Sequence, residues 1–392
     1  MEKKLTVDKA KIEGKRVLVR VDYNVPLEGT RVADDTRIRG SLPTVRHLLE
    51  RGARPILVSH LGRPDGKVVE SLRMDPVVKR AGELLGRPVR KAPGCIESEV
   101  QGMARAMKEG DVLFLENVRF YAGEEEGDPK FAGQLAALAE AYVNDAFGAC
   151  HRPHASVVGV TRHLSSSAGL LLKKEIEYAR CIFESGETPF AAVLGGAKVS
   201  DKIPILESLI ETVDSFLIGG AMAYTFLRAR GVDVGASRVE EACLETAARI
   251  LEKCEAGNVR ALLPVDHVVA RSPKDTAGMQ TVTDIPAGWM GCDIGPQTAA
   301  LYEGELARSR MVILNGPMGV FENPKFAQGT KRIVRAMAES QGVTIVGGGD
   351  SVHAVETFGA AERMSHISTG GGAFLEMLAH RTLPGIEALA GA

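Results

Sequence analysis

Short, continuous apolar runs alternate along this chain with segments of helical periodicity. Runs of this length predict strands that are buried on both faces of a parallel sheet. They lie at Val17–Val21, Pro55–Val58, Val112–Leu115 and Ala141–Val143, and then at Ala191–Leu194, Phe216–Ile218, Ala261–Pro264, Val312–Leu314 and Val343–Val346. The helical patterns include Leu42–Glu50, Pro76–Leu85, Ile203–Glu211, Glu240–Lys253 and Pro324–Ala338. Because strand and helix alternate in two separate stretches, the sequence predicts an α/β protein with two Rossmann-like domains, each a parallel β-sheet flanked by helices.

The length supports two domains, since a chain of 392 residues is longer than one that folds around a single ordinary hydrophobic core. Leu170–Phe183 is a long amphipathic segment without Gly or Pro, and a turn-like segment, residues 184–189, follows it. We therefore expect a first domain over residues 1–169, a connecting helix over 170–185 and a second domain over 186–377.

Composition excludes several classes of protein. The N-terminal residues are charged, no apolar stretch is long enough to span a membrane, and the six cysteines form no CxxC pair. The formal net charge is −2; basic residues slightly outnumber acidic ones in residues 1–185, and acidic ones dominate in 186–392. We expect a cytoplasmic protein with no membrane or nucleic-acid partner, whose first half suits a small anion.

Polar side chains follow the predicted strands of the first half. Ligands of open α/β sheets bind beyond the carboxyl ends of the strands. Arg37, from the loop 34–37, could converge there with Arg63, Arg119 and Arg152. Guanidinium groups bind phosphate and carboxylate in bidentate fashion, so such a cluster suits a ligand with two anionic ends.

Glycines follow the predicted strands of the second half. They lie in the segments 195–202, 219–222, 315–319, 347–351 and 369–372. Glycine lets backbone N–H groups approach a phosphate chain, and helix N-termini favour anions. Lys198 and Lys202 are four residues apart and would share a face on a helix. Asp350 stands among these amides, where Mg²⁺ is the expected ligand because a bare carboxylate would repel phosphates.

Simpler interpretations stay open for many of these residues. Each arginine could form a surface ion pair, and Asp350 could be a helix N-cap. Arg20 is interpreted as structural, paired with a nearby carboxylate, and Asp145 and Glu116 as residues that hold arginines in place. The triplet Glu124–Glu126 is interpreted as a solvated loop.

Arginines in one half and backbone amides in the other suit a transfer between two substrates. The P-loop and the protein-kinase motifs are absent, so a nucleotide would need a fold of a different type. The dinucleotide fingerprint GxGxxG is absent as well, which argues against a dehydrogenase. A kinase acting on another small carboxylate, or a two-lobed binding protein without catalysis, remains an alternative.

Together these segments resemble phosphoglycerate kinases over essentially the whole chain. The matching motifs, in order, are residues 20–26, 34–39, 59–64, 115–120, 144–154, 195–202, 315–322, 347–351 and 368–372. Tyr23 stands where the family usually has Phe. The resemblance implies reversible phosphoryl transfer from 1,3-bisphosphoglycerate to ADP, giving 3-phosphoglycerate and ATP, in a monomer with Mg²⁺ as cofactor. It also implies a hinge between the lobes that close for the transfer, and a C-terminal tail, residues 378–392, that returns to the first domain.

The resemblance assigns residues to each substrate. The residues expected to bind 3-phosphoglycerate are Asp22, Tyr23, Asn24, Arg37, His60, Leu61, Gly62, Arg63, Arg119 and Arg152. Those expected to bind the nucleotide are Gly196, Lys202, Gly219, Gly220, Gly291, Asn315, Pro317, Glu322, Gly348, Gly349, Asp350 and Ser351, with Asp350 on the metal.

The chemistry needs no general base, since the attacking carboxylate of 3-phosphoglycerate is already ionised near neutral pH. The protein must instead position the reactants and stabilise the charge of a metaphosphate-like transition state. Arg37 and Lys198 are assigned to the transferring oxygens, assisted by amides around Gly371 and Gly372.

Overall fold

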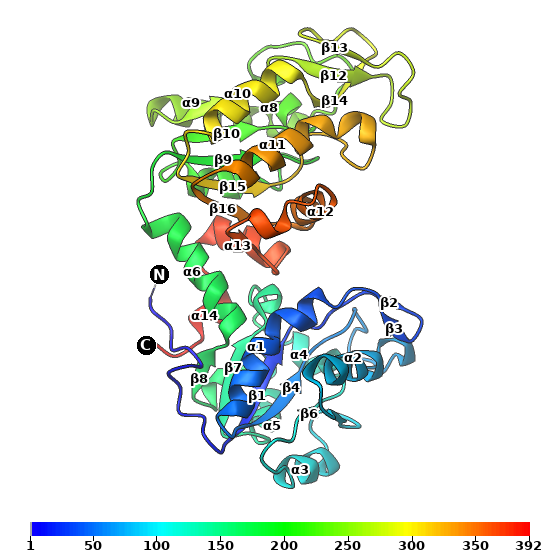
Figure 1. The fold of residues 1–392 in the computed structure, drawn as a ribbon, viewed down its shortest axis with the longest axis vertical. Helices are drawn as coiled ribbons and strands as arrows, with labels where there is room; N and C mark the ends of the chain where they lie inside the picture. The colour runs from blue at the N-terminus through cyan, green and yellow to red at the C-terminus, as the bar shows by residue number, and fades with distance from the viewer. Residues whose placement is uncertain (1) are drawn as a thin grey trace. The chain divides into compact units, whose positions relative to one another are not determined.

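The computed structural model describes residues 2–392 and divides them into two compact units (Figure 1). One unit comprises the chain up to Glu177 together with Thr382–Ala392, and the other comprises Tyr178–Arg381. Helix α6 (Leu170–Glu184) begins in the first unit and ends in the second. Each unit contains a parallel sheet flanked by helices, which confirms the predicted α/β fold class, while the predicted domain boundaries stay a prediction.

The first unit is built on a six-stranded sheet. Its order is β5 (Arg90–Lys91), β6 (Leu113–Phe114), β4 (Arg54–Val58), β1 (Arg16–Val21), β7 (Ala141–Asp145) and β8 (Ser166–Ala168), with every neighbouring pair parallel. Val19 lies between Leu57 and Val143 in the register, and all three are fully buried. The central strands are therefore enclosed on both faces, as continuous apolar runs require.

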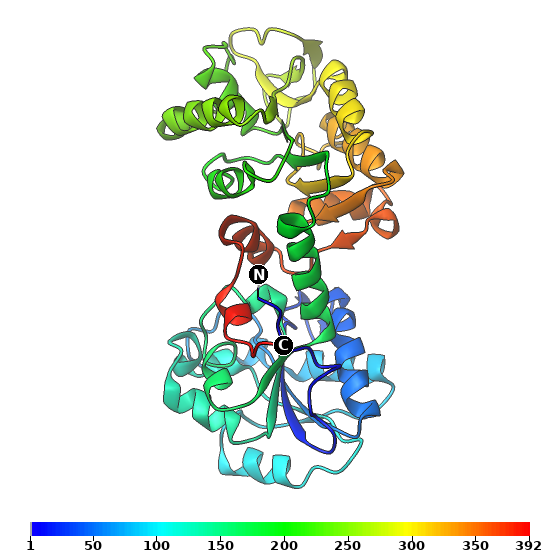
Figure 2. The ribbon, with the colours of Figure 1, turned by 90° about the vertical axis from the view of Figure 1, so that its left-hand side faces the viewer.

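Helices and a short hairpin complete the first unit. The α-helices are α1 (Thr36–Glu50), α2 (Asp75–Leu85), α3 (Ser98–Arg105), α4 (Ala122–Glu125), α5 (Pro129–Ala136) and α14 (Pro384–Glu387). The 3₁₀ turns are Glu70–Leu72, Val118–Phe120, Phe147–Ala149 and Gly159–Arg162, and the hairpin pairs β2 (Leu27–Glu28) with β3 (Arg31–Val32). The C-terminal segment pairs Gly391 with Lys4, beside the N-terminal residues (Figure 2).

The second unit repeats this plan. Its parallel sheet has the order β11 (Arg260–Leu262), β10 (Ser215–Ile218), β9 (Phe190–Leu194), β15 (Met311–Asn315), β16 (Val343–Val346) and β17 (His366–Ile367). A second, antiparallel sheet has the order β13 (Gln280–Val282), β12 (His267–Ala270) and β14 (Met290–Ile294). The carboxyl ends of β9, β10, β15 and β16 lead into the glycine-rich segments.

Helices flank the second sheet, and α10 and α11 lie side by side (Figure 1). The helices are α7 (Ile203–Leu209), α8 (Ala223–Ala229), α9 (Leu244–Ala256), α10 (Pro296–Leu306), α11 (Gln328–Glu339), α12 (Gly349–Thr357) and α13 (Gly372–His380), with 3₁₀ turns at Glu241–Cys243, Pro324–Phe326 and Ala361–Arg363. Helix α7 begins only after Lys202, so the expectation that Lys198 and Lys202 share a helical face is wrong.

Candidate functional site

The carboxyl ends of β1 and β4 in the first unit carry a continuous polar network. Arg37, in the first turn of α1, donates from Nη1 to Asp22 Oδ2 at 2.9 Å and to the Asn24 carbonyl at 3.2 Å. Asn24 Oδ1 accepts from the Gly62 amide at 2.9 Å, and the Gly62 carbonyl accepts from Arg119 Nη1 at 2.9 Å. The structure therefore links five of the predicted substrate residues through direct hydrogen bonds.

Three further predicted residues lie close to this network. Burial, followed by the positive charges of Arg20, Arg119 and Arg37, lowers the pKa of His60 well below its usual range, so the ring is neutral at pH 7. Arg63 and Arg152 are exposed, and within residues 2–392 neither forms an ion pair. Arg152 donates to His151 at 2.9 Å. Exposed guanidinium groups without a carboxylate partner keep their donors available to an anion.

Tyr23 and Leu61, also predicted at the substrate, point into the core. The Tyr23 side chain is fully buried, its hydroxyl lies 2.6 Å from Ser41 Oγ, and its amide donates to Ser59 Oγ. The backbone of Leu61 exchanges two hydrogen bonds with the side chain of Asn117. Both residues hold the loops that carry Asn24 and His60, and neither presents a side chain at the surface.

Of the two acidic residues interpreted as holding arginines in place, Asp145 has a different role and Glu116 has the expected one. Within residues 2–392 no arginine pairs with Asp145; its Oδ1 accepts from the amides of Leu171 and Leu172 and caps the start of α6. Burial raises the pKa of Asp145 to about 7. Glu116 does contact an arginine, Arg73, at 3.1 Å.

Glu124 lies in α4 and is fully buried, so the interpretation of Glu124–Glu126 as a solvated loop is wrong for this residue. Its carboxylate accepts from the Ser156 amide at 2.8 Å and from the Ser156 hydroxyl at 2.6 Å. Glu124 therefore joins the buried polar groups that lie behind the network of Arg37 and Arg119.

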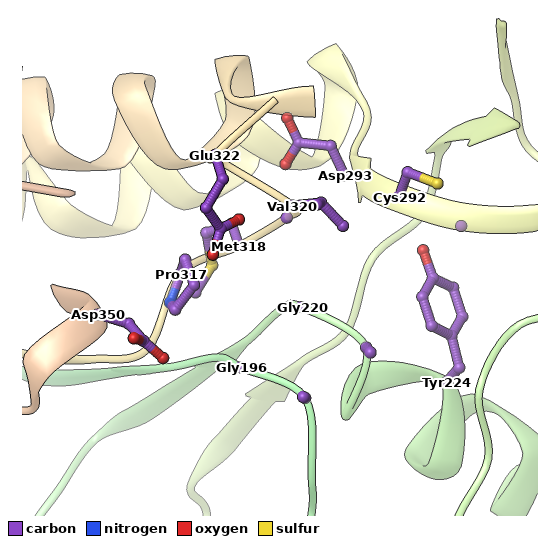
Figure 3. Close-up of a pocket in the computed structure, with 14 residues that line it drawn as sticks. Gly196, Gly220, Tyr224, Cys292, Asp293, Pro317, Met318, Val320, Glu322 and Asp350 are labelled. Carbon is purple, nitrogen blue, oxygen red and sulfur yellow. The ribbon is translucent and has the colours of Figure 1, made fainter. Parts of the chain in front are cut away.

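The second unit has a pocket of about 220 Å³ at the carboxyl ends of its strands (Figure 3). Six predicted nucleotide residues line it: Gly196, Gly220, Gly291, Pro317, Glu322 and Asp350. The Glu322 and Asp350 carboxylates lie toward one end, and the Tyr224 ring lies toward the other. The pocket therefore has an acidic end and an aromatic end, with glycine backbone between them.

Two of these glycines are required by close packing. A Cβ on Gly291 would lie 1.7 Å from the Tyr224 hydroxyl, and a Cβ on Gly220 would lie 2.5 Å from the Gly196 amide nitrogen. Gly220 also has a φ of +66°, which favours glycine. Any side chain at either position would displace the wall of the pocket.

Other predicted nucleotide residues lie behind the pocket. Lys202 donates to Asn315 Oδ1, and Asn315 Nδ2 donates to the Gly347 carbonyl at 2.6 Å. Ser351 Oγ accepts from the Gly316 amide at 2.6 Å. Burial lowers the pKa of Lys202. These bonds connect the loops after β9, β15 and β16. Gly219, which follows β10, packs closely on Met318, and Gly348 packs closely on Asn315.

Asp350 lies in the first turn of α12, whose N-cap is Gly348, so the alternative that Asp350 is the N-cap is wrong. Its side chain is exposed and lines the pocket, and Gly349 precedes it as the first residue of the helix. Within residues 2–392, no group of three or more His, Cys, Asp or Glu side chains could hold a metal ion alone. Since Mg²⁺ often takes one or two carboxylates plus substrate phosphates, Asp350 fits a magnesium ion that arrives with a nucleotide.

Besides Arg37, the residues assigned to the transferring phosphoryl group follow β9 and β17. Lys198 is exposed in the loop after β9, and no carboxylate in the described chain pairs with it. Gly371 is the N-cap of α13 with a φ of +50°, and Gly372 is the first residue of that helix. Amides at the start of a helix have no intrahelical acceptor, so those of Gly371 and Gly372 suit an anion.

Sequence reasoning missed several residues that line the pocket. They are Ala197, Ala221, Tyr224, Cys292, Asp293, Met318, Gly319 and Val320. Tyr224 comes four residues after Gly220, and Cys292 and Asp293 follow Gly291 directly. Their closeness in sequence to a predicted nucleotide-binding glycine was therefore the signal that could have placed them at the pocket. Burial raises the pKa of Asp293 to about 7, and its Oδ2 accepts from the Gly329 amide.

Known proteins place this chain in a family. A model of the family described as phosphoglycerate kinase matches residues 7–381. The chain is 54% identical to the phosphoglycerate kinase of Moorella thermoacetica, over 98% of this chain and 99% of that one. It is 51% identical to that of Trichodesmium erythraeum, over 98% of each chain.

Solved structures agree with these relatives. The structure of phosphoglycerate kinase from Coxiella burnetii superposes with a TM-score of 0.90 at 36% identity, and that from Pyrococcus horikoshii with 0.83 at 32%, each covering 98% of both chains. No helix in residues 2–392 combines the length and apolar character needed to cross a membrane. Because the family model matches nearly the whole length and the relatives from Moorella thermoacetica and Trichodesmium erythraeum are more than half identical, this chain belongs to the phosphoglycerate kinase family.

Proposed function

We propose that the first unit binds 3-phosphoglycerate and the second unit binds ADP or ATP in the reaction of this family. That reaction is the reversible transfer of a phosphoryl group from 1,3-bisphosphoglycerate to ADP, giving 3-phosphoglycerate and ATP. The observation that carries the proposal is the pocket of the second unit, where Gly196, Gly220 and Gly291 expose backbone beside Glu322 and Asp350. The network of Arg37 and Arg119 supports the assignment of the anionic metabolite to the first unit.

In the ATP-consuming direction, a carboxylate oxygen of 3-phosphoglycerate attacks the γ-phosphorus of ATP. The new P–O bond forms as the bond between that phosphorus and the β–γ bridging oxygen breaks, and ADP leaves with the electron pair. No proton moves, so the neutral His60 does not act as a base. Arg37, Lys198 and the amides of Gly371 and Gly372 are proposed to donate to the phosphoryl oxygens, where charge is spread in the transition state.

Asp350 is proposed to hold Mg²⁺ together with the nucleotide phosphates. When bound, the ion neutralises charge that develops on the β- and γ-phosphate oxygens. Lys202, Asn315 and Ser351 are proposed to act mainly by holding the phosphate loops in place, because their polar groups already bond one another and the backbone. We further propose that the enzyme is a monomer and that its glycolytic reaction proceeds in the cytoplasm.

A coupled assay tests the proposed function. ATP, magnesium and 3-phosphoglycerate are supplied, and glyceraldehyde-3-phosphate dehydrogenase oxidises NADH as 1,3-bisphosphoglycerate forms. Loss of NADH that requires both substrates and magnesium supports the assignment. If no NADH is lost although the coupling enzyme is active, the chain acts on another carboxylate or transfers nothing, and a screen of other acids follows.

Arg119→Ala is expected to raise KM for 3-phosphoglycerate at least about tenfold with a smaller change in kcat, because a charge-assisted hydrogen bond is worth about 1.5–3 kcal/mol. The matched control is Arg87→Ala, since Arg87 is exposed and its guanidinium donates to the Gly110 carbonyl. Steady-state kinetics at saturating ATP measure both variants. An unchanged KM for Arg119→Ala would remove this residue from the substrate site.

Asp350→Asn is expected to raise the magnesium concentration needed for half-maximal activity at least about tenfold, since the variant keeps the shape but loses the charge that binds the ion. Glu356→Gln, an exposed substitution at the other end of α12, is the control. Activity is measured against free magnesium at fixed ATP. If the two variants show the same magnesium dependence, Asp350 is not a metal ligand.

A further inference from the structure

A fully buried arginine lies beside the histidine of the substrate site. Arg20 is in β1 and is 0% exposed. Its Nε donates to Ser156 Oγ at 2.8 Å, its Nη1 donates to the Val21 carbonyl at 2.5 Å, and its Nη2 lies 3.2 Å from His60 Nδ1. All three guanidinium nitrogens thus have a partner at hydrogen-bond distance.

Arg20 is buried, as its structural interpretation expects, but the nearby carboxylate, Glu124, is reached through Ser156. Within residues 2–392, no carboxylate forms an ion pair with Arg20; its charge faces Glu124 through the Ser156 hydroxyl, which donates to Glu124 Oε1 at 2.6 Å. The Tyr142 hydroxyl donates to the Ser156 carbonyl at 2.9 Å and fixes this bridge. The bonds of Nε and Nη1 therefore fix the position of the guanidinium group, and Nη2 faces His60.

The chemistry of the two side chains decides which ring nitrogen carries the proton. A guanidinium group has donors and no acceptor, so the atom that it faces must accept. His60 Nδ1 must therefore present its lone pair to Arg20. Asp22 Oδ1 lies 3.9 Å from the same nitrogen, which is too far for a hydrogen bond. In a neutral imidazole with an acceptor at Nδ1, the proton is on Nε2.

We propose that Arg20 is a positioning residue that fixes His60 in the Nε2–H tautomer, so that the ring presents a donor to an anionic oxygen of 3-phosphoglycerate. The proposal rests on the proposed function, since it takes the ligand to be that anion. The His60 side chain is 8% exposed, and in the described chain Nε2 makes no hydrogen bond. The opposite tautomer would turn a lone pair toward the anion and repel it.

The surroundings of the ring favour the neutral form. The groups that face His60 are Arg20 from β1, Arg119 from the turn after β6, Arg37 from α1 and His154 from the loop after β7, with the Asp22 carboxylate 3.9 Å from Nδ1. Burial and the three guanidinium groups lower the pKa of His60, so the imidazolium is disfavoured. Arg20 thus has two effects on the ring. Its charge disfavours a doubly protonated ring, and its donor to Nδ1 places the single proton on Nε2.

The first test observes the tautomer directly. The enzyme is labelled with ¹⁵N-histidine, and long-range ¹H–¹⁵N correlation spectra of the nine histidines are recorded at pH 7 without substrate. The His60 resonances are assigned as those lost in His60→Gln. We expect a neutral ring with its proton on Nε2. A proton on Nδ1, or a doubly protonated ring, overturns the proposal, and because no turnover is needed this result is independent of whether the proposed reaction occurs.

The second test separates the two ring nitrogens functionally. The amide nitrogen of Gln can occupy the place of Nε2, whereas the amide of Asn reaches only the place of Nδ1. His60→Gln is therefore expected to keep KM for 3-phosphoglycerate within about threefold, and His60→Asn to raise it at least about tenfold, as for a lost hydrogen bond to a charged group. Equal KM values for the two variants would contradict a donor at Nε2.

The third test asks whether Arg20 is the cause. Arg20→Met alone would leave Glu124 buried without a compensating charge, so the double variant Arg20→Met with Glu124→Gln is used. In this variant we expect the His60 ring to exchange between tautomers and to gain a proton at higher pH than in the parent. If the double variant folds and the ring stays purely Nε2–H, Arg20 does not fix the tautomer. If it does not fold, the spectrum of the parent and the Gln and Asn pair still decide whether His60 has the proposed tautomer and donor.

Discussion

Replacing Arg37 by alanine is expected to lower kcat at least about a hundredfold while KM for ATP changes less than about threefold. Loss of one donor to a developing oxyanion typically costs about 3 kcal/mol of transition-state stabilisation, and an arginine on a transferring phosphoryl group can contribute more. Steady-state kinetics in both directions of the reaction measure the effect. The loss should appear in kcat, because the charge that Arg37 would stabilise is largest in the transition state.

The geometry explains why Arg37 is suited to this role. Its Nη1 is held by Asp22 and by the Asn24 carbonyl, which fixes the guanidinium plane, and its side chain is 36% exposed, so further donors can reach a ligand. Arg39→Ala is the matched control: Arg39 lies on the same helix, is 57% exposed and pairs with Asp35. If both variants retain near-parental kcat, Arg37 has no transition-state role; if both lose activity alike, the cause is a disturbed α1.

The parallel sheets could be predicted because their signal is local. Strands enclosed on both faces must be continuously apolar, and each of the nine runs predicted as strands overlaps a strand of the structure. Helix α1 was predicted from Leu42 but begins at Thr36 and contains Pro43. Proline lacks a backbone donor and usually ends a helix, so local propensity placed the start too late.

The antiparallel sheet of the second unit could not be predicted from the same signal. Its strand β13 has no buried residue, and β12 and β14 are short and contain polar or small residues. Such strands are specified by pairing with each other and not by burial on two faces. This sheet brings Cys292 and Asp293 to the nucleotide pocket beside the predicted Gly291, which is why these two residues were missed.

At the site, the types of residue were easier to predict than the orientations of their side chains. Arginines and glycines after strands mark the two ligand regions, but whether a side chain points outward depends on partners far away in sequence. Tyr23 turns inward to Ser41, and Asp145 turns to the first amides of α6. Arg20 and Glu124 are joined through Ser156, 136 and 32 residues away in the sequence. No local pattern contains these contacts.

Lys198 provides the second large expected effect. Lys198→Ala is expected to lower kcat at least about a hundredfold, with a smaller change in KM for ATP, since a removed donor to the transferring oxygens costs about 3 kcal/mol. Unlike Lys202, whose ammonium is buried against Asn315, Lys198 is exposed in the loop after β9 and has no carboxylate partner in the described chain. Its ammonium can therefore meet a phosphate without first breaking an ion pair.

The contrast between these two lysines makes the prediction specific. Lys202→Ala removes a bond between loops, so it should lower thermal stability and weaken nucleotide binding, whereas Lys198→Ala should leave the melting temperature unchanged. Lys331→Ala, at an exposed position of α11, controls for the loss of one positive charge. Lys198→Arg should recover only part of the lost kcat, because the guanidinium is planar and the ammonium acts as a point charge. Near-parental kcat in Lys198→Ala would mean that Arg37 and the first amides of α13 stabilise the charge on the transferring phosphoryl group without this side chain.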